Sequence, residues 1–232
     1  MLIPITSIDL ITADRLATTR EYYEYRRQGE GYNYNGTTFH QAVNQKYGLN
    51  LTSQSNVFAG ILFELCLFKA IVNSVMTLIA NEANYNNNAN PQEYMRHSLL
   101  SKAFSHDMAV GKYDDGYDFL LMNYNGGEKI DAKVYPSRIL ENPQTCLNYN
   151  LLVDNDQYDR HGSNIYIQGF ILTDVNLLRF YVAGWEYSDN LVPYNNIPNP
   201  GHGARVTDLR GINELINMIY QNNFNPAQYH PF

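Results

Sequence analysis

The sequence predicts an α/β protein in which a mixed central β-sheet is flanked by helices and preceded by an N-terminal helical addition. Residues 55–80 form a long, nearly all-apolar run of helical length. Stretches rich in aromatic and β-branched residues, with partly alternating polarity, follow at 116–135, 163–172 and 179–187, as expected of strands. A last stretch at 207–221 has the spacing of a closing helix.

The composition indicates a globular protein with one main core. The chain has 232 residues, of which 44% are hydrophobic and 13% aromatic, enough to bury a sizeable core. We expect a single domain over residues 1–232, with the N-terminal helical addition at 1–54 and the core at 55–221. The formal net charge is −7, which argues against a protein that holds nucleic acid by overall positive charge. A local basic groove beside an acidic metal-binding centre remains compatible with it.

Cysteine usage and the N-terminal stretch favour a reducing, cytoplasmic compartment. Two cysteines, Cys66 and Cys146, are too few for a disulfide framework in a chain of this size. MLIPITSIDL has no basic segment and contains Asp9, so we expect no signal peptide. The many Asn and Tyr residues resemble the output of an AT-rich genome, such as a phage or another mobile element, which would place the protein in a bacterial or phage-infected cell.

The N-terminal addition is expected to contain two helices. TADRLATTREYYEYRRQ (12–28) has helical spacing with Thr12 as a candidate N-cap. GTTFHQAVNQKYGLN (36–50) is a shorter expected helix that ends near Gly48. These helices would contact substrate or a partner subunit, so a homodimer is one of the expected alternatives.

The apolar run at 55–80 is either a helix surrounded by protein or a membrane span. A span would place Glu64, Lys69 and Asn73 in lipid, and each charge costs about 2.5–3.5 kcal/mol near the bilayer centre. We therefore expect a buried helix and no membrane contact.

The remaining elements follow from loop, strand and cap signals. NEANYNNNANPQE (81–93) has the composition of a loop, and a helix is expected after it through Ser101. NLLVD adds one more expected strand. Thr207 or Asp208 would cap the closing helix.

Two strand-like runs flank Asn125-Gly126, a strong signal for a two-residue hairpin turn. That turn would place Asp118 opposite Lys133 on the partner strand. A turn at Gly126-Gly127 would shift the pairing by two residues. Because directly opposed residues share a face, either register puts Asp118, Asp131 and Lys133 on one face.

Two carboxylates on adjoining strands beside a lysine have two interpretations. Hard carboxylate oxygens bind Mg²⁺, which keeps several waters and shares phosphate oxygens with its substrate. Lys133 would then position or activate the attacking water and counter charge on the phosphate. The alternative is a solvent-facing strand with a surface Asp–Lys pair worth less than about 1 kcal/mol.

The segments DGYDFLL and KIDAKVY, joined by a short hairpin, resemble the motif of the PD-(D/E)XK nuclease superfamily, which includes restriction endonucleases. The resemblance implies a restriction-endonuclease-like core whose first acid is Asp118 and whose (D/E)XK tripeptide is Asp131, Ala132 and Lys133. Tyr117 stands where the motif often has proline.

The resemblance extends over roughly residues 56–221. The superfamily core runs helix, three strands, helix, strand, and its first helix often brings a glutamate to the metals. FAGILFELCLFK is similar to that helix and implies this role for Glu64. IYIQGFI resembles the later core strand and implies that Gln168 faces the site. Asp115 remains a rival for the first acid.

The implied activity is phosphodiester hydrolysis by a Mg²⁺- or Mn²⁺-dependent nuclease, with DNA as the expected substrate. Asp118, Asp131 and the Ala132 carbonyl would be metal ligands, Lys133 would act on the attacking water, and Glu64 would hold a second metal or an ordered water. An RNA-directed nuclease offers the same phosphate chemistry. A catalytically inactive nuclease-fold module that binds or scaffolds is a further alternative, favoured by the acidic charge and opposed by the retention of both acids and the lysine.

Several further residues are candidates for nucleic-acid contact. Arg20, Arg26 and Arg27 are interspersed with tyrosines in REYYEYRRQ, a combination that neutralises phosphates and stacks on bases. The alternative there is a solvated helix with its tyrosines turned inward. Arg205 in NPGHGAR is another candidate phosphate contact.

His106, His161 and His202 are expected to be loop residues. His106 beside Asp107 could donate to a phosphate, and the Gly-rich backbone around His202 could approach one; His161 is similar. No histidine pair has zinc-ligand spacing. The chain also contains no Gly-rich NTPase loop and no GxSxG elbow.

Overall fold

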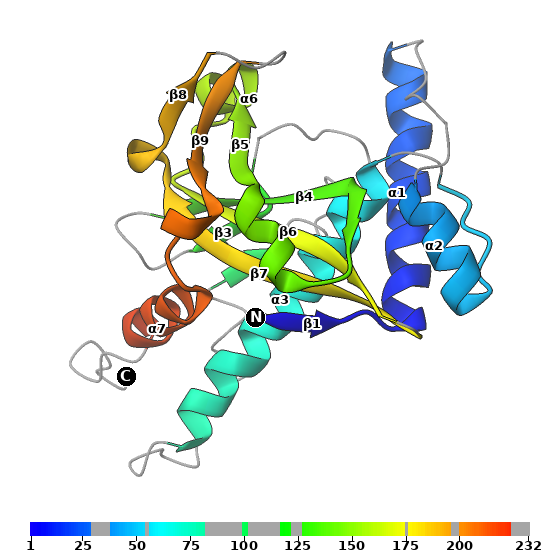
Figure 1. Ribbon diagram of the computed structural model, residues 1–232, viewed down its shortest axis with the longest axis horizontal. Helices are drawn as coiled ribbons and strands as arrows, with labels where there is room; N and C mark the ends of the chain where they lie inside the picture. Colours follow the sequence, from blue (N-terminus) through cyan, green and yellow to red (C-terminus); the bar gives the residue numbers. More distant parts are fainter. Residues whose placement is uncertain are drawn as a thin grey trace, which may run out of the picture.

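The structure confirms the predicted class: within the residues it describes, the fold is mixed α/β, with a curled mixed central sheet flanked by helices (Figure 1). The computed structural model describes residues 1–28, 38–53, 56–81, 99–101, 117–121, 127–174, 176–195 and 200–223.

In this part of the chain the central sheet has six strands in the order β1-β7-β6-β4-β3-β2. In that order they span Leu2–Pro4, Leu178–Tyr187, Ile165–Thr173, Glu128–Leu140, Phe119–Leu121 and Leu99–Ser101. β4 and β6 run parallel, and the other neighbours are antiparallel. Nearly every residue of β6 is buried, because both faces of the sheet centre are covered.

A second, antiparallel sheet has the order β5-β9-β8. Its strands are β5 (Asn150–Asp154), β9 (Gly201–Arg205) and β8 (Val192–Tyr194). Apolar residues of β5 pack with Tyr166 of β6 in one buried cluster. The small sheet therefore covers the face of the central sheet that carries the side chain of Tyr166.

Helices cover the opposite face. The described α-helices are α1 (Ser7–Gln28), α2 (Thr38–Tyr47), α3 (Val57–Asn81), α6 (Asn155–His161) and α7 (Ile212–Asn223). The described part of the chain also contains the short 3₁₀-helices η2 (Pro143–Asn148), η3 (Ser188–Asn190) and η4 (Val206–Asp208). Residues of α3 form the main core with Ile130 of β4 and with Ile165 and Ile167 of β6. Figure 1 shows α1 and α2 on one side of the molecule and the small sheet on the other.

Helix α3 is the predicted apolar helix. Its segment Val57–Leu78 is long and apolar enough to cross a membrane by composition, with a mean hydropathy of 1.8 over its most apolar window, and half of that window is buried within the protein. The core helix of a globular protein meets the same criterion. Gly169 of β6 permits close packing here, because a Cβ at this position would lie 2.2 Å from the Phe63 ring.

The N-terminal segment differs from the prediction at its start. Residues Leu2–Pro4 form an edge strand of the central sheet rather than a purely helical addition. Helix α1 begins at Ser7, so the predicted cap at Thr12 was wrong. Thr6 caps it instead: its Oγ1 accepts from the Asp9 N–H at 3.2 Å, while the Asp9 carboxylate accepts from the Thr6 N–H at 3.1 Å. This reciprocal pair satisfies helix-end donors that Thr12, inside the helix, cannot reach.

Two other expectations were wrong at element boundaries. Ser101 ends strand β2, not a helix, and residues 82–98 lie outside the described residues. Thr207 and Asp208 lie in η4, while helix α7 begins at Ile212. Helix α2 ends beside Gly48 as expected, and the strands predicted at NLLVD, 163–172 and 179–187 are confirmed as β5, β6 and β7.

Candidate metal-binding site

The β3–β4 hairpin places the two motif acids side by side, but in a different register from either one expected. Phe119 pairs with Ile130 and Leu121 with Glu128, and Asp118 directly precedes β3, with its N–H on the Ile130 carbonyl of β4. The turn residues lie within 122–126, outside the described part of the chain. Both predicted registers were wrong by an even number of residues, which leaves the side-chain faces unchanged.

Backbone hydrogen bonds hold Asp118 against β4. Its N–H donates to the Ile130 carbonyl at 2.8 Å. Its Oδ2 accepts from the Ala132 N–H at 2.7 Å. In a strand the N–H and C=O of one residue point to the same side, so the Ala132 carbonyl also faces the edge where Asp118 lies.

The charge around Asp118 is predominantly negative. Withdrawal from water raises the pKa of Asp118 well above its usual range, and the nearby Asp131 and Glu64 carboxylates raise it further. The Ala132 N–H and the Lys133 ammonium act in the opposite direction without cancelling these effects. Among the described residues, the charges that act on Asp118 are therefore the carboxylates of Asp131 and Glu64 and the ammonium of Lys133.

Glu64 reaches this site from α3. Its exposed fraction is 3%, and its carboxylate contributes to the raised pKa of Asp118. Lys69, the nearest cation along the same helix, pairs with Asp9 of α1 instead. Glu64 is thus close enough to act electrostatically on Asp118, and its role at the site stays a prediction.

Lys133 is held between two acceptors. Its Nζ lies 2.6 Å from Asp131 Oδ2, and both side chains are largely buried, with exposed fractions of 19% and 9%. The same Nζ donates to Gln157 Oε1 at 2.9 Å. Gln157 lies on α6, and the sequence analysis missed it because nothing in its local sequence indicates which strand the helix faces.

Gln168 of β6 pairs in direct register with Lys133 of β4. Its Nε2 donates to the carbonyls of Lys133 and Gly169 at 3.2 and 2.6 Å. Its side chain is fully buried, and Oε1 accepts no hydrogen bond among the described residues. An unsatisfied buried acceptor costs about 1–3 kcal/mol, which would be relieved by a donor or a cation.

Tyr166 is a further residue of this face that the sequence analysis missed. It pairs with Asp131 across β4 and β6 and is almost fully buried. Burial raises the pKa of its phenol, and the negative charge of Asp131 adds to the shift. A neutral hydroxyl-bearing ring thus flanks the second motif acid.

The donor set suits a hard divalent cation. Carboxylate, carbonyl and amide oxygens are the ligands that Mg²⁺ and Mn²⁺ prefer. Burial and two neighbouring carboxylates raise the pKa of Asp118, and Gln168 Oε1 accepts no hydrogen bond among the described residues. The carboxylates are not drawn together into a finished cage: among the described residues, no group of three His, Cys, Asp or Glu side chains is close enough to hold a metal by itself.

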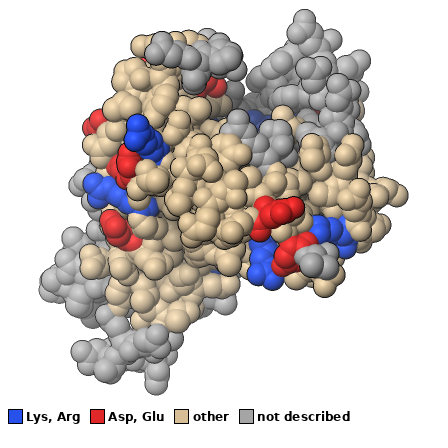
Figure 2. Space-filling view, viewed as in Figure 1, with Lys and Arg blue, Asp and Glu red and all other residues tan. Residues whose placement is uncertain are grey.

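The structure describes the side chains of two of the four arginines that were predicted to contact nucleic acid. Arg20 lies on α1 and Arg205 at the exposed end of β9, while the side chains of Arg26 and Arg27 lie outside the described residues. Figure 2 shows that the described Lys and Arg side chains on this face lie beside acidic ones and form no continuous basic surface there.

The structure contradicts the expected loop position of two histidines. His161 is the last residue of helix α6. His202 is not a solvated loop residue: it lies in β9, with its ring stacked on Tyr158 of α6 at a centroid distance of 3.9 Å. The residues His106, Asp107 and Asp115, and the side chain of His161, lie outside the described part of the chain.

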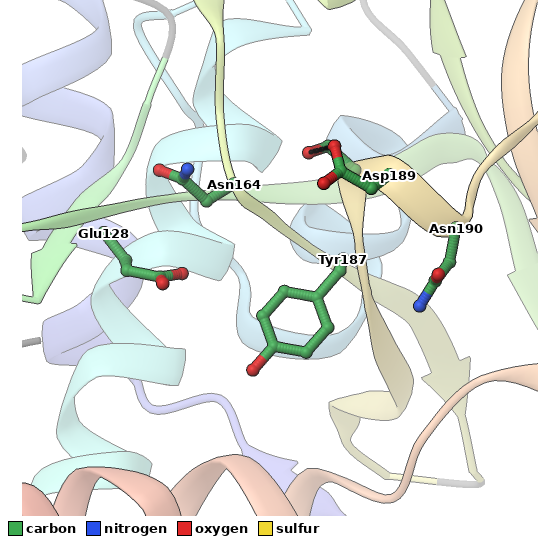
Figure 3. Close-up of a pocket in the computed structure, with 6 residues that line it drawn as sticks. Glu128, Asn164, Tyr187, Asp189 and Asn190 are labelled. Atoms are coloured by element: carbon green, nitrogen blue, oxygen red, sulfur yellow. Dashed lines mark hydrogen bonds between the residues drawn. The ribbon is translucent and has the colours of Figure 1, made fainter. Parts of the chain in front are cut away.

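A separate polar pocket of about 280 Å³ lies where β4 and β6 start and β7 ends (Figure 3). Glu128 Oε2 is buried there without a hydrogen-bond partner among the described residues, and burial raises the pKa of Glu128. None of the predicted site residues lines this pocket. Its lining consists of Glu128, Asn164, Tyr187, Ser188, Asp189 and Asn190.

No protein-family model matches the chain, and no curated protein matches its sequence significantly. The family suggested by the motif therefore rests on the residues and their arrangement.

Proposed function

We propose that this protein is a divalent-metal-dependent phosphodiester hydrolase, a nuclease of the PD-(D/E)XK kind that acts on DNA. The observation that carries the proposal is the convergence of Asp118, Asp131 and Glu64, from the β3–β4 hairpin and helix α3, on one region where, among the described residues, the Lys133 ammonium also acts on Asp118. Burial raises the pKa of Asp118, and the Asp131 and Glu64 carboxylates raise it further. Folding alone does not favour such crowding, whereas a cation would compensate it.

The topology supports a restriction-endonuclease-like core. Among the described elements, helix α3, strands β2, β3 and β4, helix α6 and strand β6 occur in this order along the chain, and the motif implies the order helix, three strands, helix, strand. Strand β5 intervenes before α6, and α6 has only 7 residues. These two departures make the likeness weakest between β4 and β6.

Each site residue has a chemical task in this proposal. Asp118, Asp131 and the Ala132 carbonyl would hold Mg²⁺ or Mn²⁺, and Glu64 would hold a second ion or orient a water. The metal, when bound, supplies a Lewis acid that favours attack by water and counters charge on the phosphate. Lys133 places its ammonium beside the second acid, where it can orient the water and stabilise the developing phosphate charge. Gln168 offers its free Oε1 to the same region.

A binding or scaffolding module without activity is the second candidate. The ion pair between Lys133 and Asp131, at 2.6 Å, favours it, because the ammonium neutralises one of the two motif acids. An RNA-directed nuclease would use the same residues, so substrate choice must be decided by experiment.

The test is incubation of the purified protein with plasmid, linear duplex, single-stranded DNA and RNA, with Mg²⁺, with Mn²⁺ and with chelator. Cleavage that requires the metal and prefers DNA is the expected result. Preference for RNA would replace the substrate and keep the mechanism. The absence of cleavage of all four substrates, together with unchanged thermal stability in Mn²⁺, would favour the inactive module.

A further inference from the structure

We propose that Gln157 is a positioning residue for Lys133: its side-chain oxygen holds the Lys133 ammonium at the site when the Asp131 carboxylate is engaged by a cation. The inference rests on the proposed function and adds to it a residue outside the motif. Lys133 Nζ contacts two acceptors, Asp131 Oδ2 at 2.6 Å and Gln157 Oε1 at 2.9 Å. Only the first of these is a candidate metal ligand.

Helix α6 is anchored so that Gln157 has little freedom. Asp154 is its N-cap, and the Asp154 Oδ1 accepts from the Gln157 N–H at 2.8 Å. Gly162 ends the helix in the left-handed conformation, with φ of 57°. A helix of only 7 residues would otherwise fray.

The neighbouring residue fixes the helix to the small sheet and to η3. The Tyr158 ring stacks on His202 of β9 with an interplanar angle of 12°. The Tyr158 hydroxyl donates to the Ser188 carbonyl at 3.1 Å. Capping, stacking and this hydrogen bond together place the Gln157 amide over β4 before any ligand arrives.

The chemistry explains why a neutral acceptor suits this position. A cation on Asp131 withdraws the carboxylate from Lys133 and repels the ammonium by Coulomb's law. A lysine side chain has four rotatable bonds and would then move toward water, because its rotamer entropy favours release. The Gln157 oxygen keeps one strong hydrogen bond to the ammonium. A carboxylate at this position would hold Lys133 too, but it would also compete for the metal.

The first experiment mimics the engaged state of Asp131 without metal. Asp131→Ala removes that acceptor, and the acetylation rate of Lys133 at one fixed pH is then followed by peptide mass spectrometry. We expect Lys133 to react about tenfold faster in Asp131→Ala/Gln157→Met than in Asp131→Ala, since a charge-assisted hydrogen bond supplies a factor of that order. Gln144→Met, a change at an exposed glutamine, is the matched control in the same background. Equal rates with and without Gln157 would overturn the proposal.

The second experiment uses cleavage. In the otherwise unchanged protein, Gln157→Met should lower kcat about tenfold with little change in KM, because the substrate still binds while Lys133 is misplaced. Gln157→Glu should restore protection of Lys133 against acetylation in the Asp131→Ala background. If Gln157→Met fails to fold by circular dichroism, Gln157→Asn, which stays polar but is too short to reach Lys133, carries the test in its place.

The two experiments separate this inference from the proposed function. A wild-type protein that cuts no nucleic acid would contradict the nuclease proposal, while the acetylation comparison would still decide whether Gln157 holds Lys133. A protein that cuts normally with Gln157→Met, and whose Lys133 reactivity is unaffected, would leave the nuclease proposal standing and remove Gln157 from it.

Discussion

Asp9, where α1 packs on α3, and Asp118, at the start of β3, are both carboxylates withdrawn from water, yet their surroundings shift their pKa values in opposite directions. Burial raises the pKa of Asp9, but hydrogen bonds from Lys69 and Thr6 outweigh it and leave the pKa below its usual value. Burial also raises the pKa of Asp118, and there Asp131 and Glu64 add to the effect, so that it stays well above the usual range.

The difference lies in how many cations serve each carboxylate. Asp9 has a lysine and a helix-capping threonine of its own. At the hairpin, the carboxylates of Asp131 and Glu64 raise the pKa of Asp118, and among the described residues the ammonium that opposes this rise is that of Lys133. The first arrangement stabilises a helix contact, whereas the second places carboxylates close enough to raise the pKa of Asp118 beyond the effect of burial; in our proposal a bound cation compensates them. Removing individual charges from each region tests this contrast.

The largest effect is expected on cleavage. Asp131→Asn or Lys133→Met should lower the metal-dependent rate by about 10²–10³-fold, because the transition state loses a ligand or a stabilising charge. Lys69→Met, which removes the cation from the other region, should leave the rate unchanged. Initial rates on the best substrate in Mn²⁺ provide the measurement. Undiminished cleavage by Asp131→Asn would contradict the assignment of the site.

Thermal stability in divalent ions is the next effect. Mn²⁺ at about 100 times its dissociation constant should stabilise the folded protein by about 2.7 kcal/mol through mass action. Melting curves with and without Mn²⁺ should show a rise in Tm for the wild type and for Lys69→Met, and a much smaller one for Asp131→Asn. Equal rises in all three proteins would place the ion elsewhere.

Asp118→Asn should stabilise the metal-free protein at neutral pH, by about 1.4 kcal/mol for each pKa unit of the shift. The folded pKa of Asp118 lies above its unfolded value, so the folded state binds the proton more tightly. Stability is then lost as pH rises from the ordinary carboxyl pKa through the folded pKa. The asparagine can still accept from the Ala132 N–H and carries no charge.

Urea unfolding at neutral pH and near pH 4 measures this effect, and the advantage of Asp118→Asn should shrink at the lower pH. A variant that is less stable than the wild type at neutral pH would show that the Asp118 charge is compensated.

The smallest effect is expected at Asp9. Asp9→Asn should destabilise the protein by less than about 1 kcal/mol at neutral pH, because the asparagine can still accept from the Thr6 N–H and the lost ion pair with Lys69, whose exposed fraction is 53%, is weakened by solvent. The folded pKa is lowered, so this stabilisation is present above the ordinary carboxyl pKa and is lost as pH falls through the folded value. Chemical unfolding of both proteins across acidic pH should show their difference vanish; a constant difference would contradict the ion pair.

The sequence was sufficient to predict that Asp118, Asp131 and Lys133 share one face of the hairpin, because this depends only on the alternation of side chains along each strand. Asp131 and Lys133 alternate with Ile130 and Ala132, and any even displacement of the hairpin keeps Asp118 on their side. The register itself could not be predicted, since several turn residues in a row offer competing turns. The start of α1 was also missed, because Thr6 and Asp9 satisfy each other in a reciprocal cap that competes with the signal at Thr12.

The sequence by itself determined the class of fold, the apolar character of α3 and the shared face of Asp131 and Lys133, because these follow from residue periodicity over short stretches of chain. Only the tertiary structure decided that Glu64 approaches Asp118, that Lys69 pairs with Asp9, and that Gln157 holds Lys133. Those contacts join residues far apart in the chain, and their formation depends on how helices and sheets pack against one another. Local sequence carries no direct record of that packing.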